Sequence, residues 1–230
     1  MSDYPPAAGA AGLTNKRLLF AREPGWQFSA MLVLEVVFLF GAVPALSAGE
    51  ADRGLANMLQ LALAAIVIAL IAKSTWLRLI LLASFGLALA SRLLPGLLPQ
   101  ATTLGMSLVY NLLATAETAR AVFGPGDVDH HRIAGAVFIY LNIALIFALA
   151  FTALNVVVPD AISALGAESR IHISEMIHFS FSTLTTLGDR HLSANSPLAY
   201  SLADLEAIIG QLFPAILLSR LVGLHLSQTR

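Results

Sequence analysis

The chain has no cysteine and few charged residues. Among its 230 residues, 12% are charged and none is cysteine. Without cysteine, the protein has no disulfide, no thiolate metal site and no cysteine nucleophile. Soluble domains usually carry about a quarter charged residues, whereas here 57% of the residues are hydrophobic and the mean hydropathy is +0.79. The composition therefore indicates a membrane protein.

The sequence also lacks the features of several function classes. Its net charge is −1, which gives no basis for nucleic-acid binding. It has no nucleophile-elbow or HExxH motif, so we expect neither enzymatic activity nor a cofactor. Segment 1–27 has no apolar core at signal-peptide spacing, and we expect a short cytoplasmic tail. Apolar runs then continue from Phe28 almost to the end, which leaves no soluble ligand-binding domain.

Long apolar runs predict an all-α membrane protein with six transmembrane helices. A spanning helix needs ~20 mostly apolar residues. Six stretches meet or approach this length: Phe28–Ser47, Asn57–Ala72, Trp76–Leu94, Thr102–Phe123, Ile133–Val158 and about Leu202–Leu226. Between the last two, the apolar segment Ser174–Thr185 is too short to span. A segment of that kind indicates a re-entrant element.

The distribution of basic residues predicts the orientation. With the N-terminus inside, nine Lys and Arg residues fall on the cytoplasmic side and four outside, in agreement with the positive-inside rule. Both termini are then cytoplasmic, and the segment from Ser174 to Arg190 opens on the outer face. The fourth predicted span contains a single arginine, Arg120, whereas voltage-sensing helices are rich in arginine. We expect a multi-pass protein of the plasma membrane without a voltage sensor.

The chain from Val122 onward carries a specific resemblance. The segments VFGPGDVDHHRIAGAVFIYLNIALIFALAF, FSFSTLTTLG and SPLAYSLADLEAIIGQLFPAILLSRLVGL follow one another in this order. They resemble the outer helix, the pore helix with the first half of the filter, and the inner helix of tetrameric P-loop cation channels with a potassium-channel-like pore. The likeness is greatest to bacterial six-span members without voltage-sensor arginines.

This resemblance implies a passive ion channel in the bacterial inner membrane. It implies a homotetramer in the lipid bilayer, with a pore helix and filter loop between helices five and six of each subunit. The implied domains are a cytoplasmic tail (1–27), a four-helix transmembrane domain (28–123) and a pore domain (124–230). Potassium, sodium or calcium would be the permeant or bound cation.

The filter sequence departs from the family's motif in its outer half. The family has Thr-x-Gly-Tyr/Phe-Gly followed by Asp, and Thr186, Leu187 and Gly188 match the first three places. The remaining three places hold Asp189, Arg190 and His191. Glycine adopts positive φ freely, whereas other residues lose ~1–2 kcal/mol, so an arginine does not preserve the outer filter. We expect an inner filter from Thr185 to Gly188 and weak selectivity among monovalent cations.

Asp189 and Arg190 are adjacent and oppositely charged, and the sequence does not determine which of them faces the ion path. We favour Asp189 facing the ion path, where it could bind calcium or sodium, with Arg190 paired to Glu175 at the outer mouth, to Glu168 or to a neighbour's Asp189. If Arg190 faces the path instead, the pore is closed or favours anions. A third arrangement is an Asp189–Arg190 ion pair between subunits in a non-conducting sensor or scaffold. His191, also at the outer mouth, is a candidate for proton sensitivity and a weak candidate metal ligand.

Four further residues are candidates for filter support and gating. We expect Thr183 to cap the pore helix and Glu206 to support the filter from behind, although an acid in a first helical turn can simply compensate the helix dipole. Gly210 and Pro214 form a predicted gating hinge, because proline removes a backbone hydrogen bond and kinks a helix. Close helix packing is the alternative explanation for Gly210.

Overall fold

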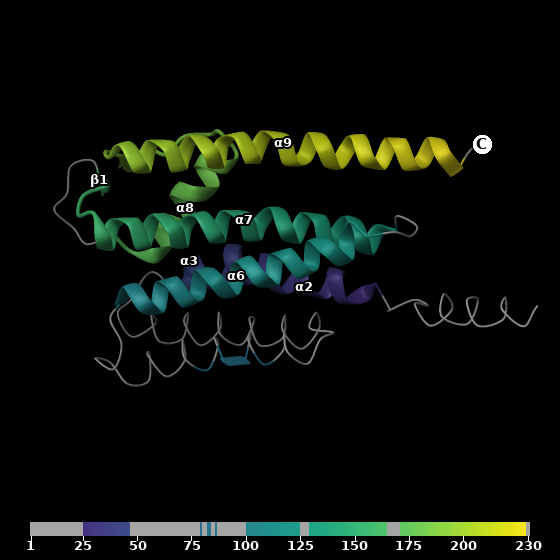
Figure 1. The fold of residues 1–230 in the computed structure, drawn as a ribbon, viewed down its shortest axis with the longest axis horizontal. Helices are drawn as coiled ribbons and strands as arrows, with labels where there is room; N and C mark the ends of the chain where they lie inside the picture. Colours follow the sequence, from purple (N-terminus) through teal and green to yellow (C-terminus); the bar gives the residue numbers. More distant parts are fainter. Residues whose placement is uncertain are drawn as a thin grey trace, which may run out of the picture.

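The computed structural model describes residues 25–46, 79, 82–83, 86, 100–124, 129–164 and 171–228. As predicted, this part of the chain is mostly helical. Its elements are α2 (Trp26–Val37), the π-helical η1 (Phe38–Ala42), α3 (Val43–Leu46), α6 (Gln100–Val122), α7 (His130–Val157), β1 (Ile162–Ala164), α8 (Ile173–Leu184), β2 (Leu192–Ala194) and α9 (Pro197–Gln228). Helix α7 lies between α9 on one side and the α2 and α6 pair on the other (Figure 1).

The predicted fifth and sixth spans are confirmed as long apolar helices, α7 and α9. Within the described ranges, these two helices have the length and composition needed to cross a membrane. The fourth predicted span is helix α6, and the first is covered by α2, η1 and α3. The second and third predicted spans, Asn57–Ala72 and Trp76–Leu94, lie outside the described residues apart from four isolated positions. The total of six spans therefore stays a prediction.

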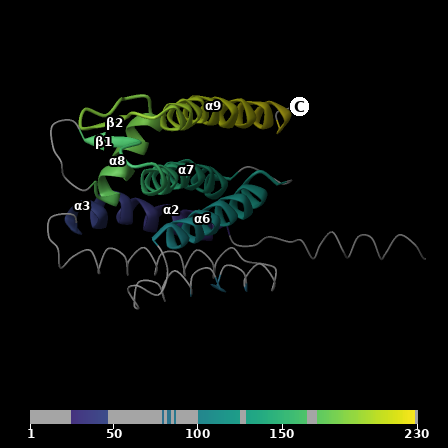
Figure 2. The same ribbon diagram turned by 60° about the vertical axis from the view of Figure 1, so that its left-hand side comes forward.

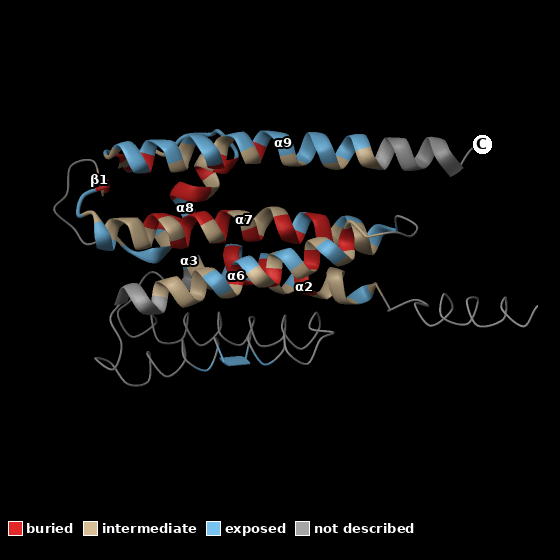
Figure 3. Ribbon diagram, viewed as in Figure 1, coloured by how far each residue is buried: buried red, intermediate tan, exposed pale blue. Residues whose placement is uncertain are grey.

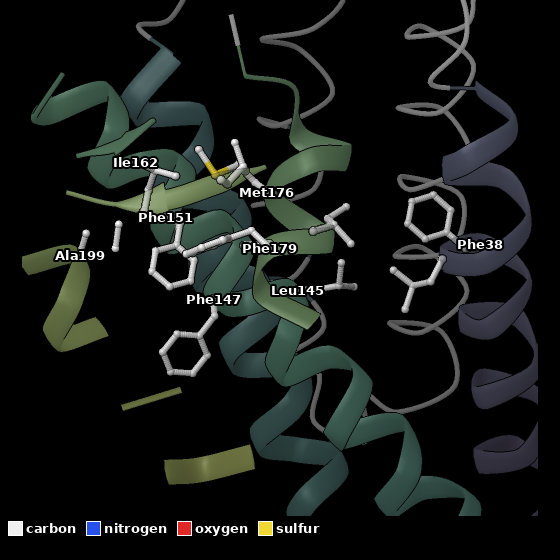
Figure 4. Packing of buried hydrophobic residues seen from close by; sticks show 13 residues of the cluster. Phe38, Leu145, Phe147, Phe151, Ile162, Met176, Phe179 and Ala199 are labelled. Carbon is white, nitrogen blue, oxygen red and sulfur yellow. The ribbon is translucent and has the colours of Figure 1, made fainter. Parts of the chain in front are cut away.

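The main apolar cluster attaches the short helix α8 to helix α7. It joins side chains of α7, α8, η1 and the first turn of α9, among them Phe38, Leu145, Phe151 and Met176 (Figure 4). The rings of Phe151 and Phe179 meet edge to face with centroids 5.0 Å apart, a geometry that aromatic pairs prefer. This packing determines where the end of α8 lies, and hence where the following loop begins.

A second apolar cluster holds α2 and α6 against the other side of α7. Its buried members include Met31, Ala114 and Ile139. A Cβ atom added at Gly135 would lie 2.5 Å from the side chain of Val122, so the absence of a side chain there allows α6 and α7 to approach closely. Helices in lipid depend on close packing of this kind, because the lipid tails are themselves apolar.

Two short strands connect the segments before and after α8. Strands β1 and β2 pair antiparallel, with Ile162 opposite Ala194 and Ala164 opposite Leu192, and they lie beside the N-terminal end of α9 (Figure 2). The sequence itself predicts no strand here, because three residues are too few for an alternating pattern to be recognised. The pairing holds the chain that follows Arg190 against the chain that leaves α7.

Helix α9 contacts the rest of the chain at its first turn, near its middle and at Arg220. Its first half packs on α8 and β2. Further along, Arg220 donates a hydrogen bond to the Phe123 carbonyl at 2.7 Å, and its guanidinium lies 5.1 Å from the centroid of the Phe123 ring. Much of the remaining surface of α9 is exposed (Figure 3).

Candidate functional site: the pore loop

The short apolar segment before the filter motif is a helix, as predicted. The prediction was Ser174–Thr185, and α8 runs from Ile173 to Leu184. Its end is a Schellman motif, in which the Leu187 amide donates to the Ser182 carbonyl at 2.8 Å and the Thr186 amide to the Thr183 carbonyl at 2.9 Å. In this motif the residue in left-handed conformation is usually glycine. Here it is Thr186, with φ of +58°.

The loop after α8 leaves its carbonyl oxygens free. The amides of Leu187 and Gly188 both donate to the Ser182 carbonyl, at 2.8 and 3.1 Å. Within the described residues, no hydrogen bond reaches the carbonyl oxygens of Thr186, Leu187 and Gly188. Thr186 and Gly188 have positive φ, +58° and +79°, and Leu187 between them does not. All of the residues from Thr185 to Gly188 are exposed in the single chain.

The Asp189 carboxylate turns back toward α8. Its Oδ2 lies 2.8 Å from Nδ1 of His178, and its Oδ1 accepts from the amides of His191 and Leu192 at 2.6 and 2.9 Å. The Asp189 side chain is 2% exposed. This is not the orientation that the charge argument favoured, in which Asp189 meets the ion. These three donors converge on this carboxylate, because the β2 pairing brings the His191–Leu192 backbone up to His178 of α8.

These contacts also affect the acidity of Asp189. Burial alone would raise the pKa of the carboxyl, but hydrogen bonds from the Leu192 amide, the His178 ring and the His191 amide lower it. The pKa of Asp189 therefore lies below its ordinary value, because each of these donors stabilises the charged form. The carboxylate anchors the loop to α8 in its ionised form.

Of the ion pairs expected for Arg190, the one with Glu175 is not formed. Arg190 and His191 are exposed, and Arg190 has no carboxylate within salt-bridge distance among the described residues. Glu175 accepts a hydrogen bond at 2.6 Å from the His172 amide, so it caps the start of α8 and does not pair with Arg190. Glu168 lies outside the described residues. In the described part of the chain, no group of three His, Asp or Glu residues could hold a metal ion.

The two predicted support residues differ in what they contact. The Thr183 hydroxyl donates to the Phe179 carbonyl of its own helix at 2.8 Å, so Thr183 is bonded to the loop through its backbone carbonyl, which accepts from the Thr186 amide, and not through its side chain. Glu206 is fully buried, and its Oε1 accepts a hydrogen bond from the hydroxyl of Ser180 in α8. Its other oxygen, Oε2, is buried and has no hydrogen-bond partner among the residues that the structure describes. Glu206 therefore holds α8, and its hydrogen bond is to α8 and not to the loop that follows.

The two residues of the predicted hinge have different environments. A Cβ atom added at Gly210 would lie 1.9 Å from the carbonyl oxygen of Leu184, the last residue of α8. This contact supports the packing role for Gly210, because a helix in contact at that residue has no room to pivot there. Pro214 is exposed and lies within α9, which continues to Gln228. Having no amide hydrogen, Pro214 cannot bond to the carbonyl of Gly210.

One residue near the loop was missed by the sequence analysis. Gln211 follows Gly210 in α9, and its Nε2 donates to the hydroxyl of Thr186 at 3.2 Å. A polar side chain among the apolar residues around Gly210 was the signal that could have identified it. No protein-family model, curated protein or solved structure matches this chain.

Proposed function

We propose that this protein is a passive cation channel, assembled from four copies around a central path. The observation that carries the proposal is the loop Thr186–Gly188, whose three carbonyl oxygens accept no hydrogen bond among the described residues. Filters of potassium-type channels use backbone carbonyls in this way, to replace the water shell of the ion. The resemblance of the segments from Val122 onward supports the same assignment.

Backbone geometry supports an inner filter in this loop. Alternation between left-handed and other conformations at Thr186, Leu187 and Gly188 turns successive carbonyls toward one side of a chain. The amides meanwhile point back to α8. One chain supplies one such loop, so the proposal requires several copies. The exposure of Leu187, 81% in the single chain, is consistent with a loop that is covered by other subunits.

Weak selectivity among monovalent cations follows from the altered outer half of the loop. Asp189 is anchored to α8 and Arg190 is exposed, so we place ion binding on the carbonyls and not on the Asp189 carboxylate. Asp189 and Arg190, which follow Gly188, are not glycine. Continuing a row of inward carbonyls through them would require backbone conformations that cost free energy in non-glycine residues. The filter that remains is short.

The exposed Arg190 favours a second candidate function. Four arginines around the outer mouth would repel cations, and the protein would then be a closed pore that acts as a sensor or scaffold, or a pore that prefers anions. The absence of a carboxylate partner for Arg190 among the described residues is the observation behind this alternative.

Ion flux from purified protein in liposomes separates these functions. The channel proposal predicts flux of both potassium and sodium, with a bi-ionic potential near zero for a potassium and sodium gradient. A strong preference for potassium over sodium would contradict the weak selectivity that we infer from the altered filter. Chloride flux would establish the anion pore instead. If flux appears only in the Arg190→Gly variant, the arginine closes the outer mouth of the native protein.

A further inference from the structure

Helix α9 contacts α8 and the pore loop at three places in succession. Glu206 accepts a hydrogen bond from Ser180 in the middle of α8. One turn later, Gly210 lies against the carbonyl of Leu184 at the end of α8. Residues four apart share a helix face, so these two contacts set the register of α9 along α8. They place the next residue, Gln211, beside the loop.

Gln211 reaches the residue of the loop that has the least favourable backbone. Thr186 has φ of +58°, a conformation that is rare for a β-branched residue. Conformations of this kind persist where the surrounding structure holds them, and they occur often at functional sites. The Thr186 hydroxyl donates to the Thr185 carbonyl at 2.7 Å and accepts from Gln211 at 3.2 Å. Glycine would relieve the backbone, but it would provide no hydroxyl for Gln211.

We propose that Gln211 is a positioning residue of the pore loop. Through the Thr186 hydroxyl it holds the loop in the conformation that leaves the carbonyls of residues 186–188 free, and it couples movements of α9 to that loop. The consequence for ion selectivity rests on the proposed channel function. The effect on the loop itself does not, so the two can be tested separately.

Hydrogen exchange measures the effect on the loop without any conduction. In the purified full chain, Gln211→Leu is expected to speed exchange of the Leu187 and Gly188 amides about five-fold, the factor that corresponds to one neutral hydrogen bond. Leu212→Met is the matched control, because Leu212 is the next residue of α9 and is half exposed, and it should leave this exchange unchanged. Unchanged exchange in Gln211→Leu would overturn the proposal.

A second variant removes the same hydrogen bond from the other side. Thr186→Gly loses the hydroxyl but also relieves the left-handed backbone, so its loop amides should exchange no faster than those of the wild type. In this background Gln211→Leu should have no further effect, since its partner is absent. If the two substitutions instead add, Gln211 acts through another contact and the proposal is wrong.

The ratio of sodium to potassium permeability tests the consequence for conduction. In liposomes, Gln211→Leu should change this ratio at least about two-fold, the effect of part of one hydrogen bond, while Leu212→Met keeps it. If Gln211→Leu conducts with the same ratio of sodium to potassium permeability as the wild type, the proposed coupling between Gln211 and the ion path is wrong. If the wild type does not conduct at all, the proposed function fails, and the exchange experiment still decides whether Gln211 positions the loop.

Discussion

Helices α7 and α9 are both long and apolar enough to cross a membrane, but the chain covers them very differently. Within its most apolar window, α7 is 56% buried, whereas α9 is 11% buried. Helix α7 packs against α2, α6, α8 and α9, while α9 contacts mainly α8 and α7. Composition therefore does not tell whether the neighbours of an apolar helix belong to its own chain. Here α7 lies at the centre of the described helices, and α9 presents most of its surface outward (Figure 3).

The exposed surface of α9 is rich in large apolar side chains. They are Leu198, Tyr200, Leu205, Ile208, Leu212, Ile216 and Leu218. Lipid tails and other subunits can both cover such a surface, because helix association in lipid depends on packing and not on apolar character alone. In the proposed tetramer, part of this surface and the pore loop face other copies. The following predictions test this difference between the two helices.

The largest effect is expected from the core of α7. Phe151 is fully buried and packs on Phe179 of α8, so Phe151→Ala should lower the free energy of unfolding by about 3–5 kcal/mol. Ile216 of α9 is 64% exposed, and Ile216→Ala should change it by less than about 0.5 kcal/mol. Unfolding of the purified protein in detergent gives both values. Equal losses would show that the two helices are not covered differently.

The contact between α9 and α8 is tested at Gly210. In Gly210→Ala the new methyl group meets the Leu184 carbonyl, and such overpacking costs about 1–3 kcal/mol. Gly105 in α6 has no atom within 4 Å of an added Cβ, so Gly105→Ala should be neutral or gain up to about 1 kcal/mol of helix propensity. Thermal unfolding compares the pair. A neutral Gly210→Ala would mean that α9 can shift away from α8 freely.

A smaller, pH-dependent effect is expected at Asp189. Because its pKa is lowered in the folded protein, its stabilisation is complete above the unfolded value of about 3.9 and is lost as the pH falls through the folded value. Asp189→Asn should therefore cost about 1–2 kcal/mol near neutral pH. The loss should disappear at a pH below both values. Unfolding measured across this range checks the sign, and a loss that does not vary with pH would contradict it.

The smallest effect on the subunit is expected on the exposed side of α9. Ile208 is 55% exposed, so Ile208→Ser should change the stability of the single chain by less than about 0.5 kcal/mol. If this surface faces other copies, the same variant should lower the fraction of tetramer in native mass spectra. A wild-type protein that is monomeric under these conditions would refute the proposed assembly.

Helices α7, α8 and α9 could be predicted because length and apolar character are properties of a local stretch of chain. The boundaries of α8 differ by one residue from those predicted. The direction of Asp189 could not be predicted in this way. It depends on His178, 11 residues earlier, and on the amides of His191 and Leu192, whose positions follow from the unpredicted pairing of β1 with β2.

The order of apolar segments and the TTLG turn were thus sufficient to locate the helices and the loop. Tertiary structure decided which residues hold the loop and the neighbouring helices in place. Asp189 anchors it, Gly210 allows α9 to touch α8, and Gln211 donates to Thr186 across 25 residues of sequence. The physical reason is that a hydrogen bond needs donor and acceptor within about 3 Å. That distance depends on the register between packed helices, which no local pattern in the chain encodes.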